Sequence, residues 1–251
     1  MAGFNVIIPA RYESSRFPGK PLIDLDGKSM IRRVYEQASN SDADTVYVAT
    51  DDERIVDEVE SFGGRIVMTN PDHPTGTDRI FEAASLIGLG DDDIVVNVQG
   101  DEPLIPPSVI NKVAGMIDSN VQMSTLCELI IDPKEVFDPN VVKVISDANG
   151  IALYFSRAPI PWSRDHFGSG SIPNGISWYR HLGIYAYTAA MLARFVTWDP
   201  APLEVAEKLE QLRALYNGEK IKIAISPDKI PPGIDVPGDV ERTLKVLKEG
   251  A

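Results

Sequence analysis

Cysteine and histidine are scarce in this sequence. Among 251 residues there are one cysteine, Cys127, and three scattered histidines. A single cysteine excludes an internal disulfide framework, and the histidines do not recur at the spacing of a metal motif. A chain of this length buries on the order of 70–75% of its unfolded surface, so it needs no such staples. With 43% hydrophobic residues, the composition is that of an ordinary globular protein.

Positive charge is also in short supply. Lysine and arginine number 24 against 37 aspartates and glutamates, which gives a formal net charge of −13. A surface this negative repels nucleic acid and anionic lipid over most of its area, so we expect neither a nucleic acid nor a membrane as partner. A small anionic molecule is not excluded, because it needs only a local cluster of cations.

Long hydrophobic runs are missing. The first apolar run, Phe4–Pro9, is too short for the core of a signal peptide or for a membrane span, and no positive residue precedes it. We therefore expect a soluble protein of the cytoplasm.

Strand-like and helix-like segments alternate through the first half of the chain. Continuous apolar runs predict strands at Phe4–Ile8, Thr45–Ala49, Arg65–Met68 and Ile94–Val98. Helical spacing of apolar residues predicts helices at Met30–Ala38, Glu53–Phe62, Asp78–Leu86 and Ser108–Ile117. Four such alternations indicate βαβ units, and hence an α/β fold with a mostly parallel, Rossmann-like sheet flanked by helices.

The pattern becomes richer in strands in the second half. An Asn-Gly pair between Val141–Ser146 and Ile151–Ser156 predicts a hairpin. Residues 161–177, rich in Gly, Ser and Pro, are expected to form a loop. Further strands are predicted at Leu182–Tyr187 and Ile221–Ile225, and helices at Leu203–Tyr216 and Pro237–Lys248. No linker divides the chain, so we expect one domain, 1–251, with a β-rich insertion at roughly 130–190.

The segment 9–22 (PARYESSRFPGKPL) concentrates positive charge after the first predicted strand. Arg11, Arg16 and Lys20 are accompanied by one acid, Glu13, in a chain that is otherwise strongly negative. Open α/β sheets bind ligands at the carboxyl ends of their strands, which is where this loop begins. Arginine grips phosphate through two parallel hydrogen bonds and lysine acts as a point charge, so the loop is predicted to bind phosphates.

Other residues of the same loop fit this prediction. Ser14 and Ser15 add hydroxyl and amide donors, and Gly19 allows the backbone to approach a ligand closely. The alternative is a solvated basic loop that happens to follow a strand. The loop is neither a GxxxxGK[ST] phosphate loop nor a GxGxxG dinucleotide motif, which counts against an ATPase and an NAD enzyme.

The segment IIPARYESSRFPGKPL (7–22) is also similar to the N-terminal signature of the sugar nucleotidylyltransferases, most closely of the CMP-Kdo synthetase family (3-deoxy-manno-octulosonate cytidylyltransferases). Seven further segments resemble that family in the same order: VATDDERI, TGTDRI, VNVQGDEPLI, ALYFSRAPIPW, RHLGIYAY, LEQLRALYNGEKI and GIDVPGDVER. Eight segments in register make the match specific. They imply a fold of the nucleotide-diphospho-sugar transferase type.

Two aspartates are the candidate metal ligands. Asp101, in the segment QGDEP, directly follows the predicted strand Ile94–Val98. Mg²⁺ is usually held by one or two carboxylates together with substrate phosphates, but a turn or a helix cap explains Asp101 equally well from its residues alone. The resemblance implies that Asp101 and Asp235 together hold Mg²⁺. The alternative for Asp235 is an N-cap of the helix predicted after it.

The resemblance also implies a reaction and the residues that serve it. CMP would pass from CTP to the anomeric hydroxyl of Kdo, releasing pyrophosphate. The implied catalytic residues are Arg11, Arg16, Lys20, Asp101 and Asp235. The implied nucleotide-binding residues are Ala10, Arg11, Ser14, Arg16, Lys20, Thr75, Gly76, Arg79 and Asp101. The implied sugar-binding residues are Gln99, Arg157, His181, Tyr185, Glu210 and Gln211.

Several of these residues have a competing structural explanation. Arg79 could be a helix-surface arginine, His181 a core histidine with its hydrogen bonds satisfied, and Glu210 part of a solvated helix face. For Arg157, a contact with the sugar carboxylate is the expected role.

Other substrates and a non-catalytic role stay open. The true substrate could be 8-amino-3,8-dideoxy-manno-octulosonate in place of Kdo, and a CMP-sialate synthetase or another sugar nucleotidylyltransferase is a weaker alternative. A nucleotide-sensing module that has kept the fold would be expected to lose an acid at the metal positions, and both are present. The family implies a homodimer that serves lipopolysaccharide synthesis.

Overall fold

The computed structural model describes residues 3–13, 17–167 and 175–249. Part of the predicted loop 161–177 and residues Ser14, Ser15 and Arg16 therefore lie outside the described residues.

The strands are β1 Phe4–Pro9, β2 Thr45–Thr50, β3 Ile66–Met68, β4 Ile94–Asn97, β5 Met123–Leu129, β6 Lys143–Ser146, β7 Ala152–Ser156, β8 Tyr179–Thr188 and β9 Ile221–Ile225. The helices are α1 Met30–Ser39, α2 Glu53–Ser61, α3 Gly76–Leu86, α4 Pro107–Ala114, α5 Pro133–Phe137, α6 Ala189–Phe195, α7 Pro202–Glu207, α8 Leu212–Tyr216 and α9 Asp239–Glu249, with a 3₁₀ turn η1 at Lys20–Leu22.

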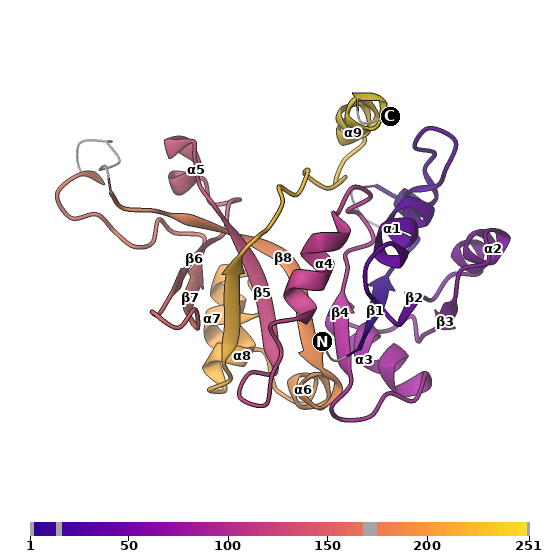
Figure 1. The fold of residues 1–251 in the computed structure, drawn as a ribbon, viewed down its shortest axis with the longest axis horizontal. Helices are drawn as coiled ribbons and strands as arrows, with labels where there is room; N and C mark the ends of the chain where they lie inside the picture. The colour runs from indigo at the N-terminus through magenta and orange to yellow at the C-terminus, as the bar shows by residue number, and fades with distance from the viewer. Residues whose placement is uncertain (1–2, 14–16, 168–174, 250–251) are drawn as a thin grey trace.

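All these strands belong to one sheet. Its main path runs β3-β2-β1-β4-β8-β5-β9, with β6 and β7 attached at the start of β8. In Figure 1 the strands run from β3 on the right, through β1 and β4, to β6 and β7 on the left. Strand β1 pairs in parallel with β2 and β4, as the alternation of strands and helices predicts.

The continuous apolar run of β1 has a direct structural reason. Val6, Ile7 and Ile8 are all fully buried, but Val6 and Ile8 belong to one hydrophobic cluster and Ile7 to another. Helices α1, α2 and α4 cover the first face of the sheet, and α3, α6 and α8 cover the second. A strand between two helical layers needs apolar side chains on both faces, which confirms the predicted α/β architecture.

The β-rich region at 130–190 contributes to the main sheet. Strand β8 lies between β4 and β5 and runs antiparallel to both. The predicted hairpin is confirmed as β6 and β7. Its turn is fixed by Asp147, whose Oδ1 accepts hydrogen bonds from the backbone N–H groups of Asn149 and Ile151, both at 2.8 Å.

Other elements differ from the predictions. The helix predicted at Leu203–Tyr216 is wrong as a single helix, because Lys208 adopts a left-handed conformation (φ 55°) and ends α7 before α8 begins. Strand β5 is missed because Ser124 and Thr125 interrupt its apolar pattern. Their hydroxyls are satisfied inside the core, donating to the carbonyl oxygens of Val113 and Ile184 at 2.7 Å each.

The C-terminal helix α9 lies apart from the sheet, joined to β9 by an extended segment (Figure 1). Its apolar residues Val240, Leu244 and Leu247 pack on a small hydrophobic cluster. That cluster consists of Phe17, Ile23, Leu25, Met30 and Ile234. This packing brings the segment before α9, which contains Asp235, beside the N-terminal loop.

None of the helices in the described ranges combines the length and the hydropathy that a membrane span requires.

Candidate active site

The candidate residues gather at the carboxyl edge of the parallel strands. Ala10 and Arg11 follow β1, Asp51 follows β2, and Asp101 lies four residues after the end of β4. Ala10 is buried, and its N–H donates to the carbonyl oxygen of Ala49 at 2.9 Å, which continues the pairing of β1 with β2 past the strand end. Parallel strands end at the same edge, so three loops distant in sequence meet there.

Lys20 joins the two candidate metal ligands. Its Nζ lies 2.7 Å from Oδ2 of Asp101 and 3.8 Å from Oδ1 of Asp235, and its side chain is only 14% exposed. Three of the five residues predicted to be catalytic therefore form one charged cluster. Within the described residues, no group of three or more His, Cys, Asp or Glu side chains is arranged to hold a metal ion. A metal ion bound by these two carboxylates would therefore need further oxygen ligands, such as those of a bound phosphate.

The main chain holds the two aspartates together. The N–H of Ile234 donates to the carbonyl oxygen of Asp101 at 2.9 Å. A Cβ atom on Gly233 would lie 2.9 Å from that same oxygen, so the close approach of the two segments requires glycine. The position of Asp235 relative to Asp101 is thus set by backbone contacts.

The alternative reading of Asp235 as a helix N-cap is wrong. Helix α9 begins at Asp239, and it is Oδ2 of Asp239 that accepts the N–H groups of Asp235 and Val236, at 2.9 and 3.0 Å. These two hydrogen bonds lower the pKa of Asp239. Asp235 is left with its carboxylate directed to the Lys20 ammonium.

The backbone around Gly19 sets the position of Lys20. Gly19 adopts φ +72°, a left-handed conformation that favours glycine, and its N–H donates to the carbonyl oxygen of Tyr12 at 2.8 Å. This turn starts η1 at Lys20. The loop therefore folds back on itself and directs Lys20 to the end of β4.

Glu102 is a half-buried acid next to Asp101 in the sequence, and its Oε2 atom is buried. Its Oε2 has no hydrogen-bond partner among the described residues. Burial, with a smaller contribution from the neighbouring charge of Asp101, raises the pKa of Glu102 to about 7. The pKa of this carboxyl group therefore lies near neutral pH.

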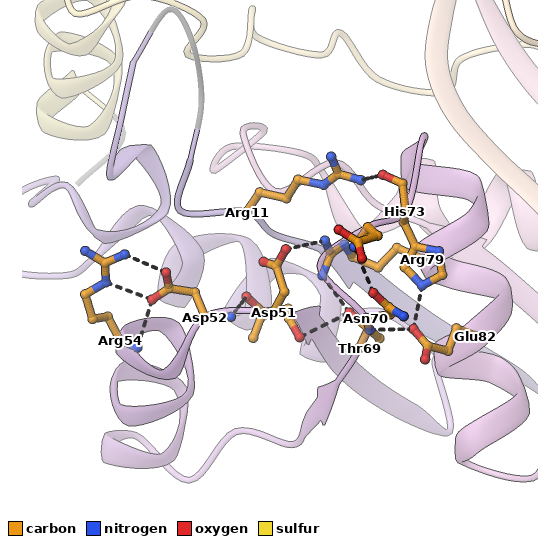
Figure 2. Close-up of polar contacts among 11 residues, drawn as sticks. Arg11, Asp51, Asp52, Arg54, Thr69, Asn70, His73, Arg79 and Glu82 are labelled. Atoms are coloured by element: carbon orange, nitrogen blue, oxygen red, sulfur yellow. Dashed lines mark hydrogen bonds and ion pairs between the residues drawn. The ribbon is translucent and has the colours of Figure 1, made fainter.

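A cavity of about 500 Å³ opens beside Arg11, where the loops after β1, β2 and β3 meet. Arg11 donates to the backbone oxygen of His73 at 2.5 Å, which links the loop after β1 to the loop after β3 (Figure 2). The volume is within the range of small-molecule sites. The lining residues are Arg11, Glu13, Asp51, Asp52 and Pro71.

Arg79 lies behind this cavity. Its side chain is 0% exposed, and its two terminal nitrogens donate to Oγ1 of Thr69 at 2.6 Å and to Oδ2 of Asp51 at 2.7 Å (Figure 2). The alternative reading as a surface arginine is therefore wrong. Arg79 does not line the cavity itself, but it holds the carboxylate of Asp51, which does.

The other predicted nucleotide-side residues begin α3. Thr75 is its N-cap: Oγ1 accepts the N–H of Asp78 at 3.3 Å and donates to the Asp78 carboxylate at 2.7 Å. Gly76 is the first helical residue and approaches the ring of Pro9, with the nearest atom 4.0 Å from where a Cβ would be. The start of α3 therefore lies against the end of β1.

A second, smaller cavity of about 60 Å³ lies between β4, β8 and the start of α8. Four of the predicted sugar-binding residues line it, namely Gln99, Tyr185, Glu210 and Gln211. Its other lining residues are Asn97, Met123, Tyr187 and Phe195. A cavity of this size has room for one or two polar groups of a ligand rather than for a whole sugar.

Polar atoms in this second cavity lack partners. Asn97 Oδ1, Tyr185 Oη, Glu210 Oε1 and Gln211 Nε2 are buried and make no hydrogen bond to the described residues. Leaving a buried polar atom unpaired costs about 1–3 kcal/mol, so four of them beside one cavity indicate a ligand that supplies the missing partners. The reading of Glu210 as part of a solvated helix face is wrong.

His181 and Arg157 do not line that cavity. The His181 ring packs edge-on against Phe155, and its Nε2 lies 3.1 Å from Oγ1 of Thr125. Burial lowers the pKa of His181 to about 3, so the ring is neutral. This geometry matches the core-histidine alternative.

Arg157 binds backbone oxygens. Its guanidinium donates to the carbonyl oxygens of Glu207 at 2.7 Å, Pro139 at 2.9 Å and Lys208 at 3.4 Å. These hydrogen bonds hold the turn between α7 and α8, which precedes Glu210.

The sequence contained a signal for some of the residues that were missed. Asn97 is a polar residue at the end of an otherwise apolar strand run, and a buried amide without an obvious partner marks a place where a polar ligand belongs. Asp51 carries no such signal, because a polar residue after a strand is ordinary in any α/β loop.

A cationic loop and paired carboxylates at the carboxyl edge of a mostly parallel sheet are the features of an α/β nucleotidyltransferase. The cytidylyltransferase family profile matches residues 5–221. A 3-deoxy-manno-octulosonate cytidylyltransferase of Hahella chejuensis is 50% identical over 255 residues, covering 100% of both chains. One of Saccharophagus degradans is 54% identical over 252 residues, covering 98% of each. The chain therefore belongs to the cytidylyltransferase family and, within it, to the 3-deoxy-manno-octulosonate cytidylyltransferases.

Solved structures agree with this assignment. A CMP:2-keto-3-deoxy-manno-octonic acid synthetase, solved as a complex with CTP, superposes with a TM-score of 0.91 at 37% identity and covers 100% of both chains. A nucleotidyl transferase from Methanothermobacter, at 16% identity and a TM-score of 0.65, shares the fold.

Proposed function

We propose that this chain transfers CMP from CTP to the anomeric hydroxyl of Kdo, giving CMP-Kdo and pyrophosphate. The relatives that match it over its whole length carry the name of this activity, and the solved relative was captured with CTP. The observation that carries the proposal is the convergence of Asp101 and Asp235 on the Lys20 ammonium.

Mg²⁺ fits this site. Asp101 and Asp235 already surround one cation, the ammonium of Lys20, so their oxygens are arranged to share positive charge. Two carboxylates completed by phosphate oxygens are a usual ligand set for Mg²⁺. When bound, the ion would neutralise the triphosphate and stabilise the leaving pyrophosphate.

The chain's own cations would bind the triphosphate. Arg11 follows β1 and Lys20 begins η1, and Arg16 is predicted to join them. Each cation within about 4 Å of a phosphate oxygen contributes on the order of 4 kcal/mol at an effective dielectric near 20, before desolvation is subtracted. The start of α3, with Thr75 and Gly76, adds backbone N–H groups with a favourable helix dipole.

The two cavities suggest where the other parts of the substrates lie. The cavity of about 500 Å³ beside Arg11 would take the nucleoside, and the polar cavity around Glu210 would take hydroxyl groups of the sugar acid. The chain would act mainly by holding the sugar hydroxyl in line with the α-phosphorus. The contact of Arg157 with the sugar carboxylate and the part of His181 in the sugar site stay predictions.

The assay that tests this proposal is direct. Protein incubated with CTP, Mg²⁺ and Kdo should release pyrophosphate and form CMP-Kdo, detected by mass spectrometry. Parallel incubations with 8-amino-3,8-dideoxy-manno-octulosonate, sialic acid and hexose 1-phosphates compare the alternatives. Turnover with the 8-amino sugar alone would move the assignment to that variant, and silence with every acceptor would overturn the proposal.

The assembly and the setting belong to the same proposal. We expect a cytoplasmic homodimer that serves lipopolysaccharide synthesis. Several apolar side chains of the β-rich region are exposed to solvent, among them Ile131 at 87% exposure. A second copy of the chain would cover such a surface. Light scattering on the purified chain measures the mass of the assembly.

A further inference from the structure

Lys20 occupies the position between the two carboxylates that are proposed to hold the metal. Its ammonium lies within hydrogen-bond distance of Asp101 and within ion-pair distance of Asp235. We propose that Lys20 is a built-in counter-cation that blocks this position until a nucleotide arrives, so that a divalent ion enters together with the triphosphate and not before it. The inference rests on the proposed function, because it takes these two carboxylates as the metal ligands.

The carboxylate pair does not need Lys20 to stay together. The contact of Ile234 N–H with the Asp101 carbonyl oxygen, at 2.9 Å, and the close approach at Gly233 hold the two segments through main-chain atoms. Removing the ammonium would therefore leave two negative groups side by side without the charge of Lys20 between them. Such a pair attracts a divalent ion strongly.

With Lys20 in place, a free divalent ion gains little at this site. The ion must approach carboxylate oxygens to about 2.0–2.1 Å, if it is Mg²⁺, and give up water that it holds tightly. The ammonium already stands 2.7 Å from Asp101 Oδ2, so the two cations would repel each other at close range. The charge of the aspartates is also partly neutralised before the ion arrives.

A triphosphate gives Lys20 a better partner. The main chain at Lys20 is fixed by the turn at Gly19 and by a 3.3 Å hydrogen bond from Ile23 N–H to its carbonyl oxygen, but the four-carbon side chain is flexible. A triphosphate carries several negative charges and brings its own divalent ion. The ammonium can then pass from the carboxylates to a phosphate, while the ion takes both aspartates.

Direct metal binding tests this order. Free Mn²⁺ is measured by electron paramagnetic resonance while Mn²⁺ alone is titrated into nucleotide-free protein. The proteins are the parent chain, Lys20→Met, Lys20→Arg and the double variant Lys20→Met with Asp101→Asn. We expect Lys20→Met to bind Mn²⁺ at least about tenfold more tightly than the parent, and Lys20→Arg to bind as weakly as the parent, because it keeps a cation in place. The double variant should lose the gain. Thermal melts of all four proteins show whether each is folded.

The outcomes separate this inference from the proposed function. A folded Lys20→Met protein that binds Mn²⁺ no more tightly than the parent would overturn the inference, as would a gain that persists in the double variant. Titrations of the parent and of Asp101→Asn in the presence of CTP test the metal site itself. If Asp101→Asn binds Mn²⁺ with CTP as well as the parent does, then the proposed metal ligands are wrong, whatever Lys20→Met shows.

Discussion

Thr77, in the first turn of α3, donates a 2.6 Å hydrogen bond to Oε2 of Glu210, 133 positions later in the chain. The bond connects the helix that starts against the end of β1 with the small polar cavity. It fixes one oxygen of the Glu210 carboxylate, while the other, Oε1, is buried and has no partner within the described residues. The regions proposed to bind the two substrates are therefore linked by a hydrogen bond.

The unpartnered hydroxyl of Tyr185 gives the first prediction. Tyr185→Phe should raise the KM for the sugar acid about tenfold, the value of one lost hydrogen bond of about 1–1.5 kcal/mol. The free energy of unfolding of the ligand-free protein should stay the same or rise, because the hydroxyl has no hydrogen-bond partner in the described part of the chain. Urea unfolding and steady-state kinetics measure the two effects. Tyr216→Phe, at an exposed position, is the matched control. A loss of stability without a change in KM would show that the hydroxyl is structural.

Asp101→Asn should reduce kcat by about 10³-fold or more, because a neutral amide cannot replace a carboxylate beside the metal and a loss of several kcal/mol is expected. The melting temperature should change little, since the backbone carbonyl that holds Ile234 is unaffected. Asp92→Asn, in an exposed loop, controls for the loss of one negative charge. Near-normal turnover in Asp101→Asn would contradict the metal assignment.

Arg79→Met should destabilise the fold by about 3 kcal/mol, because it leaves the largely buried carboxylate of Asp51 without its cation. Arg54→Met is the control. It also removes an arginine that pairs with an aspartate, but the Arg54 side chain is 55% exposed, so the free energy of unfolding should fall by less than about 1 kcal/mol. Urea unfolding measures both. The double variant with Asp51→Asn should recover part of the loss, and strictly additive effects would show that the two side chains are not coupled.

His181 predicts how stability depends on pH. Its folded-state pKa of about 3 lies below the ordinary value of 6.5, so between these values the unfolded chain binds a proton that the native protein does not. The free energy of unfolding should therefore fall as the pH drops below 6.5, by at most about 1.4 kcal/mol per pH unit from this group. His181→Gln should show a smaller fall between pH 7.5 and 5.5 in urea unfolding. Parallel curves for the two proteins would mean that the ring is not held neutral by burial.

Helices and strands were predictable from the sequence where the spacing of apolar residues followed a single helical or strand pattern. The bounds of α1 and β9 agree with the apolar periodicity to within a residue, because side-chain burial repeats along a regular element. The break at Lys208 was not predictable, since the apolar spacing continues across it. Strand β5 was hidden because its hydroxyls find partners only in the folded core.

The candidate site divides in the same way. The family resemblance named Tyr185, Glu210 and Gln211 together, and the structure brings them to one cavity. The resemblance did not predict that Arg79 is buried behind Asp51, or that Arg157 binds backbone oxygens. Those arrangements depend on which neighbours the folded chain supplies to a long, flexible side chain.

The sequence by itself determined an α/β protein with a cationic loop after its first strand, because periodicity and charge are properties of neighbouring residues. Only the tertiary structure decided that Asp101 and Asp235 meet at Lys20, and that unpaired polar atoms surround one small cavity. The order of strands in the sheet and the packing of α9 on the N-terminal loop bring these residues together. Contacts of this kind depend on distance in space, which spacing along the chain does not contain.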